Sequence, residues 1–327
     1  MSADARTSVL VVGASATDPP PGLAATSDAI DVAYADTAED VAKAIDRADV
    51  IFAWRARREL LEEAWPNRAR LRWIQTASAG VDSLLFPALV ESDVVVTNAR
   101  GIFDDAIAEW AVGMMALFAK GVLGVLERQR RHEWRHELTE SLAGQNALVV
   151  GVGGIGRAIG RNARALAMDV LGVGRTARGG DEVFRAIVGS DELPDVLPWA
   201  DVVVDALPAT PETRRVFDAA AFAAMRPGAR FLNVGRGSTV DEEALVEALR
   251  AHRIAGAALD VFEEEPLPHD SPLWDLPNVV VSPHMSGDFA GWHEAAVELF
   301  LENLLRFVRG ERLRGVVDKR LGYPAGP

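Results

Sequence analysis

The chain has 327 residues, which is enough for two domains that each bury their own core. Hydrophobic residues make up 49% of the chain and charged residues 25%, a composition typical of soluble globular proteins. The absence of cysteine excludes disulfides, thiolate-bound zinc and cysteine nucleophiles. A net charge of −14 argues against nucleic acid or an anionic membrane as a partner.

The first half of the chain alternates short apolar runs with charged, helix-like stretches. Four runs predict buried strands, at residues 8–13, 50–54, 71–78 and 93–99. Because the runs are continuous and rich in valine and isoleucine, they indicate a parallel sheet covered on both faces. The residues before the first run carry an acid and no basic segment, so we expect a strand there, no signal peptide, and a cytoplasmic protein.

The most apolar stretch, residues 106–126, is interrupted by Glu109 and Lys120. A membrane span usually needs about 18 uncharged residues, so we expect a long buried helix over residues 105–126 that bridges two domains. A basic run follows at residues 128–136. We interpret it as a solvated helix face or a subunit-contact arm, and the alternative is a patch that binds anions or nucleic acid.

The second half repeats the alternation of apolar runs and helices. Strands are predicted within residues 147–154, 169–174, 201–207, 230–235, 256–262 and 278–284. Acids at the start and basic residues near the end of 241–254 predict a helix. The fold class is therefore α/β, with two Rossmann-like, doubly wound parallel-sheet domains and a cleft between them. We expect a flavodoxin-like substrate domain of residues 1–98 plus 288–327, and a dinucleotide-binding Rossmann domain of residues 99–287.

A glycine-rich turn directly follows the strand at 147–150. Gly151, Gly153 and Gly156 form the pattern G-x-G-x-x-G, with Gly154 and Ile155 inside it. Such glycines allow a tight turn, a close approach of the backbone to a pyrophosphate, and packing of helix against strand. The following helix N-terminus offers free N–H groups to phosphates. The pattern predicts dinucleotide binding, and the alternative is a purely structural turn.

The position that decides between the two dinucleotides carries no acid. In NAD-binding units an Asp or Glu about 20 residues beyond the turn holds the adenosine ribose. In this chain the region reads Gly174, Arg175, Thr176, with Arg178 close behind. The two arginines and the threonine hydroxyl suit the 2′-phosphate of NADP(H), so we predict NADP(H) as the preferred cofactor. The alternative is that both arginines are ordinary surface residues and NAD(H) is used.

Three polar residues come just after predicted strands of the second half: Arg236, Glu265 and His284. Together with "TASAGVD" (76–82), "VVVTNARG" (94–101), "AIAEW" (106–110) and "ALPATPET" (206–213), they make the sequence resemble the D-isomer-specific 2-hydroxyacid dehydrogenase family over nearly its whole length. Its character is similar to that of glyoxylate/hydroxypyruvate reductases. The resemblance implies that Arg236, Glu265 and His284 are the catalytic residues.

The chemistry of these side chains fits the reduction of a 2-keto acid. Arg236 can clamp the carboxylate with two hydrogen bonds and polarise the carbonyl group. His284 is a suitable proton donor, because the unperturbed pKa of histidine is about 6.5. Glu265 would orient the imidazole and favour its protonated form. A shift of one or two positions would give that role to Glu263 or Glu264.

The resemblance implies further contacts with the cofactor and the substrate. Asp260 would lie near the nicotinamide carboxamide, although a capping or turn aspartate is the alternative. The other implied cofactor contacts are Pro208, Val234, Gly235 and Gly287. The implied substrate contacts are the backbone of Ser78, Ala79 and Gly80 together with Arg236 and Trp54, and Trp54 is equally consistent with a core residue. The resemblance also implies a homodimer formed through the cofactor domain.

The sequence departs from the family pattern in two places, at Trp110 and at "HMSG" (284–287), which leaves the identity of the keto acid open. A non-catalytic dinucleotide sensor on the same fold is the alternative function. Oxidation of formate or phosphite is a third reading, although formate dehydrogenases pair their histidine with a glutamine. We find no metal-ligand spacing and no G-x-S-x-G elbow. The five remaining histidines are expected at the surface: His132, His136, His252, His269 and His293.

Overall fold

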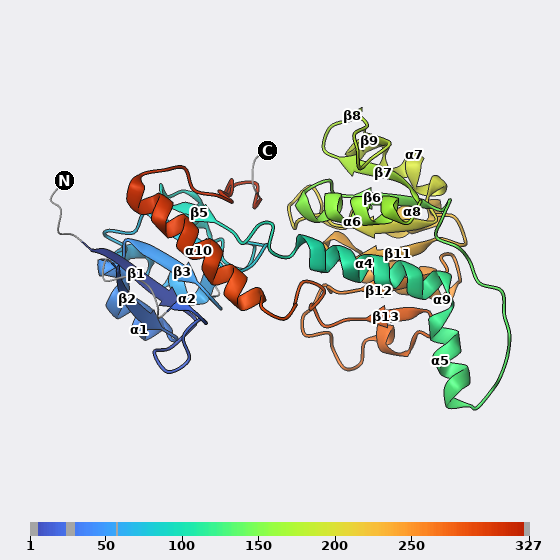
Figure 1. Ribbon diagram of the computed structural model, residues 1–327, viewed down its shortest axis with the longest axis horizontal. Helices are drawn as coiled ribbons and strands as arrows, with labels where there is room; N and C mark the ends of the chain where they lie inside the picture. The colour runs from blue at the N-terminus through green and yellow to red at the C-terminus, as the bar shows by residue number, and fades with distance from the viewer. Residues whose placement is uncertain (1–5, 24–29, 57, 324–327) are drawn as a thin grey trace. The chain divides into compact units, whose positions relative to one another are not determined.

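The computed structural model describes residues 6–23, 30–56 and 58–323. Within this part the chain divides into two compact units, whose helices and strands are labelled in Figure 1. Unit 1 comprises the residues up to Ile102 and those from Phe289 onward, and unit 2 comprises Phe103–Asp288. The two predicted parallel-sheet domains are confirmed, and each has its own sheet and its own hydrophobic core.

Unit 1 is built on a five-stranded parallel sheet in the order β2-β1-β3-β4-β5. The strands are β1 (Thr7–Val12), β2 (Ile30–Ala35), β3 (Val50–Ala53), β4 (Trp73–Thr76) and β5 (Val95–Thr97). The helical segments are α1 (Ala38–Ala44), η2 (Ile45–Arg47), α2 (Arg58–Glu62), η3 (Trp65–Asn67), α3 (Pro87–Val90) and α10 (Trp292–Arg309). Strand β2 was not predicted, because this edge strand exposes alternate residues and lacks a continuous apolar run.

Successive residues of the unit 1 strands pack against opposite layers, as the period of two requires. Leu10 and Ile51 face the cluster that includes Val41 of α1 and Leu61 of α2. Val9, Val50 and Phe52 face the other cluster, to which α10 contributes Phe300 and Leu304. Because both faces are covered, the strands read as unbroken apolar runs, and this is why four of the five could be predicted.

Unit 2 contains an eight-stranded sheet in the order β13-β12-β11-β10-β6-β7-β9-β8, parallel except for the edge strand β8. Its strands are β6 (Asn146–Val150), β7 (Asp169–Gly174), β8 (Arg178–Gly179), β9 (Ala186–Gly189), β10 (Val202–Asp205), β11 (Arg230–Asn233), β12 (Gly256–Leu259) and β13 (Val279–Val281). Its helical segments are α4 (Asp104–Ala119), α5 (Val122–Arg130), α6 (Gly154–Ala165), η4 (Ser190–Glu192), α7 (Leu193–Val196), η5 (Leu197–Trp199), α8 (Ala219–Ala224), η6 (Gly237–Thr239), α9 (Glu242–Arg250) and η7 (Pro272–Asp275). The predicted strands of this half all form, whereas β8 and β9 were not predicted.

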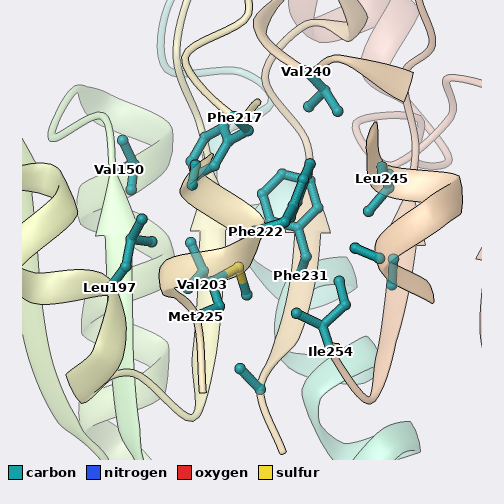
Figure 2. Packing of buried hydrophobic residues seen from close by; sticks show 14 of the residues in the cluster. Val150, Leu197, Val203, Phe217, Phe222, Met225, Phe231, Val240, Leu245 and Ile254 are labelled. Atoms are coloured by element: carbon teal, nitrogen blue, oxygen red, sulfur yellow. The ribbon is translucent and has the colours of Figure 1, made fainter. Parts of the chain in front are cut away.

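The core of unit 2 lies between the sheet and the layer that contains α8 and α9. Phe217, Phe222 and Phe231 form its aromatic centre, with ring centroids 4.8 Å and 5.4 Å apart for the two pairs that include Phe231. Figure 2 shows these rings together with Val203 of β10 and Leu245 of α9. The opposite face of the sheet carries α6, which α4 packs against.

The long helix expected over residues 105–126 is wrong in two respects. Gly121 adopts a left-handed conformation with φ 60°, so the chain forms two helices, α4 and α5, whose axes are bent by 64°. Glycine tolerates this conformation without a steric cost, which is why the break occurs there. Moreover, α4 and α5 lie within unit 2 and do not bridge two domains. In the described residues no single helix is long and apolar enough to cross a membrane, and only this bent pair passes by length and composition.

The basic run at 128–136 is helical only as far as Arg130. Beyond it the chain forms a long loop (Figure 1). The side chains of Trp134 and Leu138 on this loop are exposed. Arg128 and Arg135 form ion pairs with Glu137 at 2.9 Å and 3.1 Å, and further arginines pair with Glu127 and Glu133. Acidic neighbours therefore compensate much of the positive charge of this arm, which we define as residues 131–143.

Candidate active site

The polar residues predicted in the second half gather at one edge of the unit 2 sheet. The register pairs Asn233 of β11 with Leu259 of β12, and Leu259 with Val281 of β13. The residues that directly follow these parallel strands therefore lie at the same carboxyl edge, where α/β sheets bind their ligands. This edge carries Arg236, Asp260 and His284.

His284 and Glu265 form a direct hydrogen bond. The distance from His284 Nδ1 to Glu265 Oε2 is 2.7 Å, while Glu265 Oε1 accepts the Phe262 N–H at 3.0 Å. The carboxylate is thus held at both oxygens and fixes the plane of the imidazole. Glu263, the neighbour that a shift in register would have selected, instead pairs with Arg215 at 3.2 Å.

The electrostatics of this pair favour a protonated imidazole. The hydrogen bond that His284 donates to Glu265 raises the pKa of His284, and it outweighs burial and the positive charge of Arg236, which both lower it. Burial raises the pKa of Glu265, but the hydrogen bonds from His284 and the Phe262 N–H, with the charge of Arg236, bring it below its usual value. The pair therefore holds a proton on His284 and a negative charge on Glu265.

Arg236 follows β11 and is half-buried. Its Nη1 donates to the carbonyl oxygen of Gly235 at 2.7 Å, and its charge acts on the pKa of both His284 and Glu265. A guanidinium, a carboxylate and an imidazole that are distant in the sequence are thus neighbours in unit 2. This grouping can hold an anionic substrate and deliver a proton to it.

Asp260 holds the loop that carries His284. Its side chain is 1% exposed and accepts hydrogen bonds from Ser282 Oγ at 2.6 Å, Met285 N at 2.9 Å and Ser286 N at 3.0 Å. These contacts are those of a turn aspartate, and they fix His284 with φ 53°, a backbone conformation that few non-glycine residues adopt. A contact between Asp260 and the cofactor stays a prediction.

The glycine-rich turn has the geometry that a dinucleotide requires. Gly151 has φ 103°, and a Cβ atom there would lie 2.6 Å from the carbonyl oxygen of Ala206. A Cβ on Gly156 would overlap the carbonyl oxygen of Gly151, so the start of α6 can lie close to the turn only with glycine. Around Gly153 no atom lies within 4 Å of such a Cβ, so the backbone of this turn is open to a close approach, whereas the Asp104 carboxylate lies against Gly154 at the start of α6. Helix N-termini of this kind bind phosphate groups through their first N–H groups.

The side chains after β7 are exposed, including those of Arg175, Thr176 and Arg178. Arg175 lies near enough to Glu212 for its charge to help lower the pKa of that carboxyl, after the larger effects of hydrogen bonds. Asp181, the next acid along the chain, accepts the N–H groups of Val183 and Phe184 and pairs with Arg157 at 2.8 Å, which lowers its pKa to about 2. The carboxylate of Asp181 therefore stabilises the turn at residues 181–184.

The remaining predicted cofactor contacts lie near the same turn or the His284 loop. A Cβ on Gly235 would lie 2.6 Å from the carbonyl oxygen of Leu207, next to Pro208, and Val234 is buried. Gly287 lies against Phe103 of unit 2. The described residues contain no group of His, Asp and Glu side chains that could hold a metal ion.

The predicted substrate residues of unit 1 follow β3 and β4 at the carboxyl edge of that sheet. Trp54 is 7% exposed and belongs to the core, where its ring stacks on Trp292 at 5.9 Å between centroids. Asn98 Nδ2 donates to the carbonyl oxygen of Ala79 at 2.5 Å, and Ser78 Oγ to that of Gly80 at 2.7 Å, so the loop 78–80 is held from within unit 1.

His293 is not the surface residue that the sequence suggested. Its ring lies 3.9 Å from that of Trp292 and 5.2 Å from that of Trp54, measured between centroids. It is only partly exposed, because the first turn of α10 brings it onto this aromatic pair. Sequence reasoning also missed two buried residues near Arg236, namely Asp205 and Thr239, because their burial and their contact across 34 residues depend on the packing of the sheet.

Comparison with known proteins is consistent with this geometry. Residues 112–286 match the family model described as D-isomer specific 2-hydroxyacid dehydrogenase, NAD binding domain. A D-3-phosphoglycerate dehydrogenase from Methanocaldococcus jannaschii is 31% identical over 88% of this chain, which spans only 55% of that longer protein. A glyoxylate reductase from Pyrococcus furiosus is 33% identical over 80% of each chain.

A solved structure extends the similarity to the whole fold. The NADPH-dependent glyoxylate/hydroxypyruvate reductase from Sinorhizobium meliloti, in complex with NADP and sulfate, has 27% identity and a TM-score of 0.85, covering 97% of this chain and all of its own. The match to the family model extends over more than half of the chain, and the relatives cover most of it. This chain belongs to the D-isomer specific 2-hydroxyacid dehydrogenases, a family of NAD(P)-dependent oxidoreductases.

Proposed function

We propose that this protein uses NADPH to reduce a small 2-keto acid, such as glyoxylate or hydroxypyruvate, to the corresponding 2-hydroxy acid, which is the D-isomer where the product is chiral. The observation that carries the proposal is the hydrogen bond between His284 and Glu265 with the charge of Arg236 beside it. Relatives named glyoxylate reductase support the choice of substrate.

Reduction of a keto acid consumes one hydride and one proton, and the protein handles the proton. When bound, the reduced nicotinamide supplies the hydride to the carbonyl carbon. His284, as the imidazolium, donates its Nε2 proton to the carbonyl oxygen, which becomes the hydroxyl group of the product. Glu265 keeps the ring oriented and stabilises its charge before the transfer, and Arg236 binds the substrate carboxylate and polarises the carbonyl group.

The glycine-rich turn and the start of α6 would bind the dinucleotide cofactor. Gly151, Gly153, Gly156 and the N-terminus of α6, which begins at Gly154 and Ile155, would bind the pyrophosphate. The remaining contacts proposed for the cofactor are Pro208, Val234, Gly235, Asp260 and Gly287.

We propose NADP(H) as the preferred cofactor. Arg175, Thr176 and Arg178 would bind the 2′-phosphate, because all three are exposed after β7 and the next acid along the chain, Asp181, pairs with Arg157. The relative from Sinorhizobium meliloti, which is named as NADPH-dependent and carries NADP, supports this preference.

For the substrate, we propose contacts with Trp54 and with the backbone of Ser78, Ala79 and Gly80 in unit 1. The Ser78 N–H donates to Thr76 Oγ1 at 3.2 Å, and the carbonyl groups of Ala79 and Gly80 accept from Asn98 and Ser78, so we propose the N–H groups of Ala79 and Gly80 as the donors to a carboxylate. Trp54 is 7% exposed and packs against aromatic neighbours, so only a small part of its surface can contribute.

We also propose a homodimer that uses the cofactor-binding unit. α5 has no buried residue, and Val125 and Leu126 on it are exposed, as are Trp134 and Leu138 on the arm 131–143. The test is to measure the molar mass in solution by light scattering, for the unchanged protein and for the double variant Trp134→Ser with Leu138→Ser. If the dimer depends on these side chains, the double variant should be a monomer.

The function itself is tested with a panel of 2-keto acids, each assayed with NADPH and with NADH. His284→Ala should lower kcat by roughly 100- to 10,000-fold, the contribution of a positioned general acid, while NADPH binding is retained. Arg236→Ala should likewise abolish turnover and raise KM for the keto acid. Turnover that survives either substitution would refute the assignment of that residue, and binding of NADPH without turnover of any acid would favour the sensor.

A further inference from the structure

The carbonyl oxygen of Arg236 lies at the end of a buried chain of hydrogen bonds. Asp205, the last residue of β10, and Thr239, the last residue of η6, are both completely buried. Thr239 Oγ1 lies 2.5 Å from Asp205 Oδ2 and also 2.5 Å from the carbonyl oxygen of Arg236. The other carboxyl oxygen, Asp205 Oδ1, accepts the Leu207 N–H at 2.9 Å.

The number of hydrogen atoms that these three groups carry determines which of them donate and which accept. The Thr239 hydroxyl has a single hydrogen and can donate it to only one of its two partners. The carbonyl oxygen of Arg236 has none, and a threonine in a helical turn commonly donates to the carbonyl three residues earlier. If Thr239 donates to Arg236, the short contact with Asp205 requires the proton to come from the carboxyl group.

Among the described residues that surround Asp205, we find no cation that would stabilise its ionised form. Its register partners on the adjacent strands are Val150 of β6 and Asn233 of β11, both uncharged. On the turn that follows β11 the charged side chain is that of Arg236, whose Nη1 donates to the Gly235 carbonyl oxygen. On the far side of η6, Asp241 accepts the Ala244 N–H as the cap of α9 and also pairs with Arg215.

The burial of Asp205 also favours a proton on its carboxyl group. It raises the pKa of Asp205 to about 7, although the hydrogen bonds from Thr239 and the Leu207 N–H work in the opposite direction. A carboxyl group that lies at this depth and has no cation among its partners is favoured in its neutral form below neutral pH.

We propose that Asp205 is held as the neutral acid and, through the Thr239 hydroxyl, positions Arg236 for binding of the keto acid. Asp205 and Thr239 are thus positioning residues and contact neither substrate nor cofactor. The inference depends on the proposed function, because it assumes that Arg236 clamps the substrate carboxylate.

The position of the Arg236 carbonyl matters because it is the hub of the turn between β11 and α9. This oxygen also accepts Asn233 Nδ2 at 3.2 Å and the Thr239 N–H at 3.2 Å. The hydroxyl contact is the shortest of the three. If Asp205 ionises, its carboxylate can only accept, so the Thr239 hydroxyl donates to Asp205 instead of to the Arg236 carbonyl oxygen. The carbonyl oxygen then loses this donor, and Arg236 is held less firmly.

Two pairs of substitutions test the chain. Asp205→Asn offers an N–H to Thr239 in place of the acid O–H, whereas Asp205→Leu offers nothing. Thr239→Ser keeps the hydroxyl group, whereas Thr239→Val removes it at nearly constant shape. Asp201→Asn, at the opposite end of β10, is the matched control for general disturbance of that strand.

The readouts are KM and kcat for glyoxylate, or for the best keto acid of the panel, and the Kd of NADPH from protein fluorescence. We expect Asp205→Leu and Thr239→Val to raise KM for the keto acid about tenfold, the scale of one lost hydrogen bond. The Kd of NADPH should change little, and Asp205→Asn and Thr239→Ser should match the unchanged protein. At a pH well above the pKa of Asp205, Asp205→Asn should bind the keto acid more tightly than the unchanged protein, because an amide cannot lose this proton.

Each outcome supports or overturns the proposal. If Asp205→Asn behaves like Asp205→Leu, or if Thr239→Val leaves KM unchanged, the neutral-acid chain is wrong. If Asp205→Leu does not fold, the comparison of Thr239→Val with Thr239→Ser decides alone. Loss of activity in Arg236→Ala together with normal Thr239→Val overturns only this inference, whereas full activity of Arg236→Ala overturns both the clamp and the inference.

Discussion

From the hydrogen bond between Glu265 and His284 we predict how kcat/KM depends on pH. In the reductive direction His284 must carry the proton, so kcat/KM should fall as the pH rises through its pKa. Glu265 raises this pKa, first through the hydrogen bond and then through its charge. Glu265→Gln keeps an acceptor for Nδ1 but removes the charge, so the pKa of His284 should fall and reduction should fail at a lower pH.

The size of the shift follows from the geometry of the pair. A hydrogen bond to a charged group contributes about 1.5–3 kcal/mol and a neutral one about 1 kcal/mol. The side chains of His284 and Glu265 are 51% and 36% exposed, so solvent screens part of this difference. We take a remaining difference of about 1 kcal/mol, which at about 1.4 kcal/mol per pH unit lowers the pKa by about 0.7 unit.

Steady-state kinetics in both directions provide the assay. Oxidation of the hydroxy acid needs neutral His284, so its acidic limb should move to lower pH by the same amount as the alkaline limb of reduction. Glu264→Gln is the control, because Glu264 is an exposed neighbour with the same charge. Limbs that stay in place in Glu265→Gln, or that move to higher pH, would refute the proton-transfer role of the pair.

Three further substitutions test the cofactor site and the core. Arg175→Ala should raise KM for NADPH about tenfold or more and leave KM for NADH nearly unchanged, since only NADPH carries the 2′-phosphate; equal effects on both would contradict the NADP preference. Gly156→Ala should lower both Tm and NADPH affinity because its Cβ would overlap the Gly151 carbonyl oxygen, whereas Gly113→Ala, with open space around its Cβ, should be tolerated. Phe231→Ala should cost about 3–5 kcal/mol in urea unfolding of unit 2, as a fully buried aromatic residue in a tight cluster.

The architecture could largely be predicted from the sequence, because both sheets are covered on two faces. Strands such as β6 and β10 then appear as continuous apolar runs, and α9 shows its acidic start and basic end. The elements that escaped prediction lie where local pattern is weak. β2 is an edge strand with alternate exposure, and β8 and β9 are short segments at the opposite edge of the other sheet.

Other features depended on the conformation of a single residue or on distant neighbours. The break between α4 and α5 occurs at Gly121, whereas Gly113 lies unbroken within α4, and no rule of composition separates the two. His293 belongs to the aromatic cluster with Trp54 because α10 packs across the sheet of unit 1, after more than two hundred intervening residues. Local periodicity carries no information about such a contact.

The sequence by itself determined which polar residue follows each strand, because the strand and that residue are adjacent in the sequence. It also determined the glycine turn, whose function depends on the lack of side chains at fixed spacing. Only the tertiary structure decided which groups are partners. Glu265 and not Glu263 contacts His284, and Asp205 forms a hydrogen bond with Thr239, which is 34 residues away in the sequence. The physical reason is that hydrogen bonds and charge act over a few ångströms, and the packing of the sheet, not the order of the chain, sets those distances.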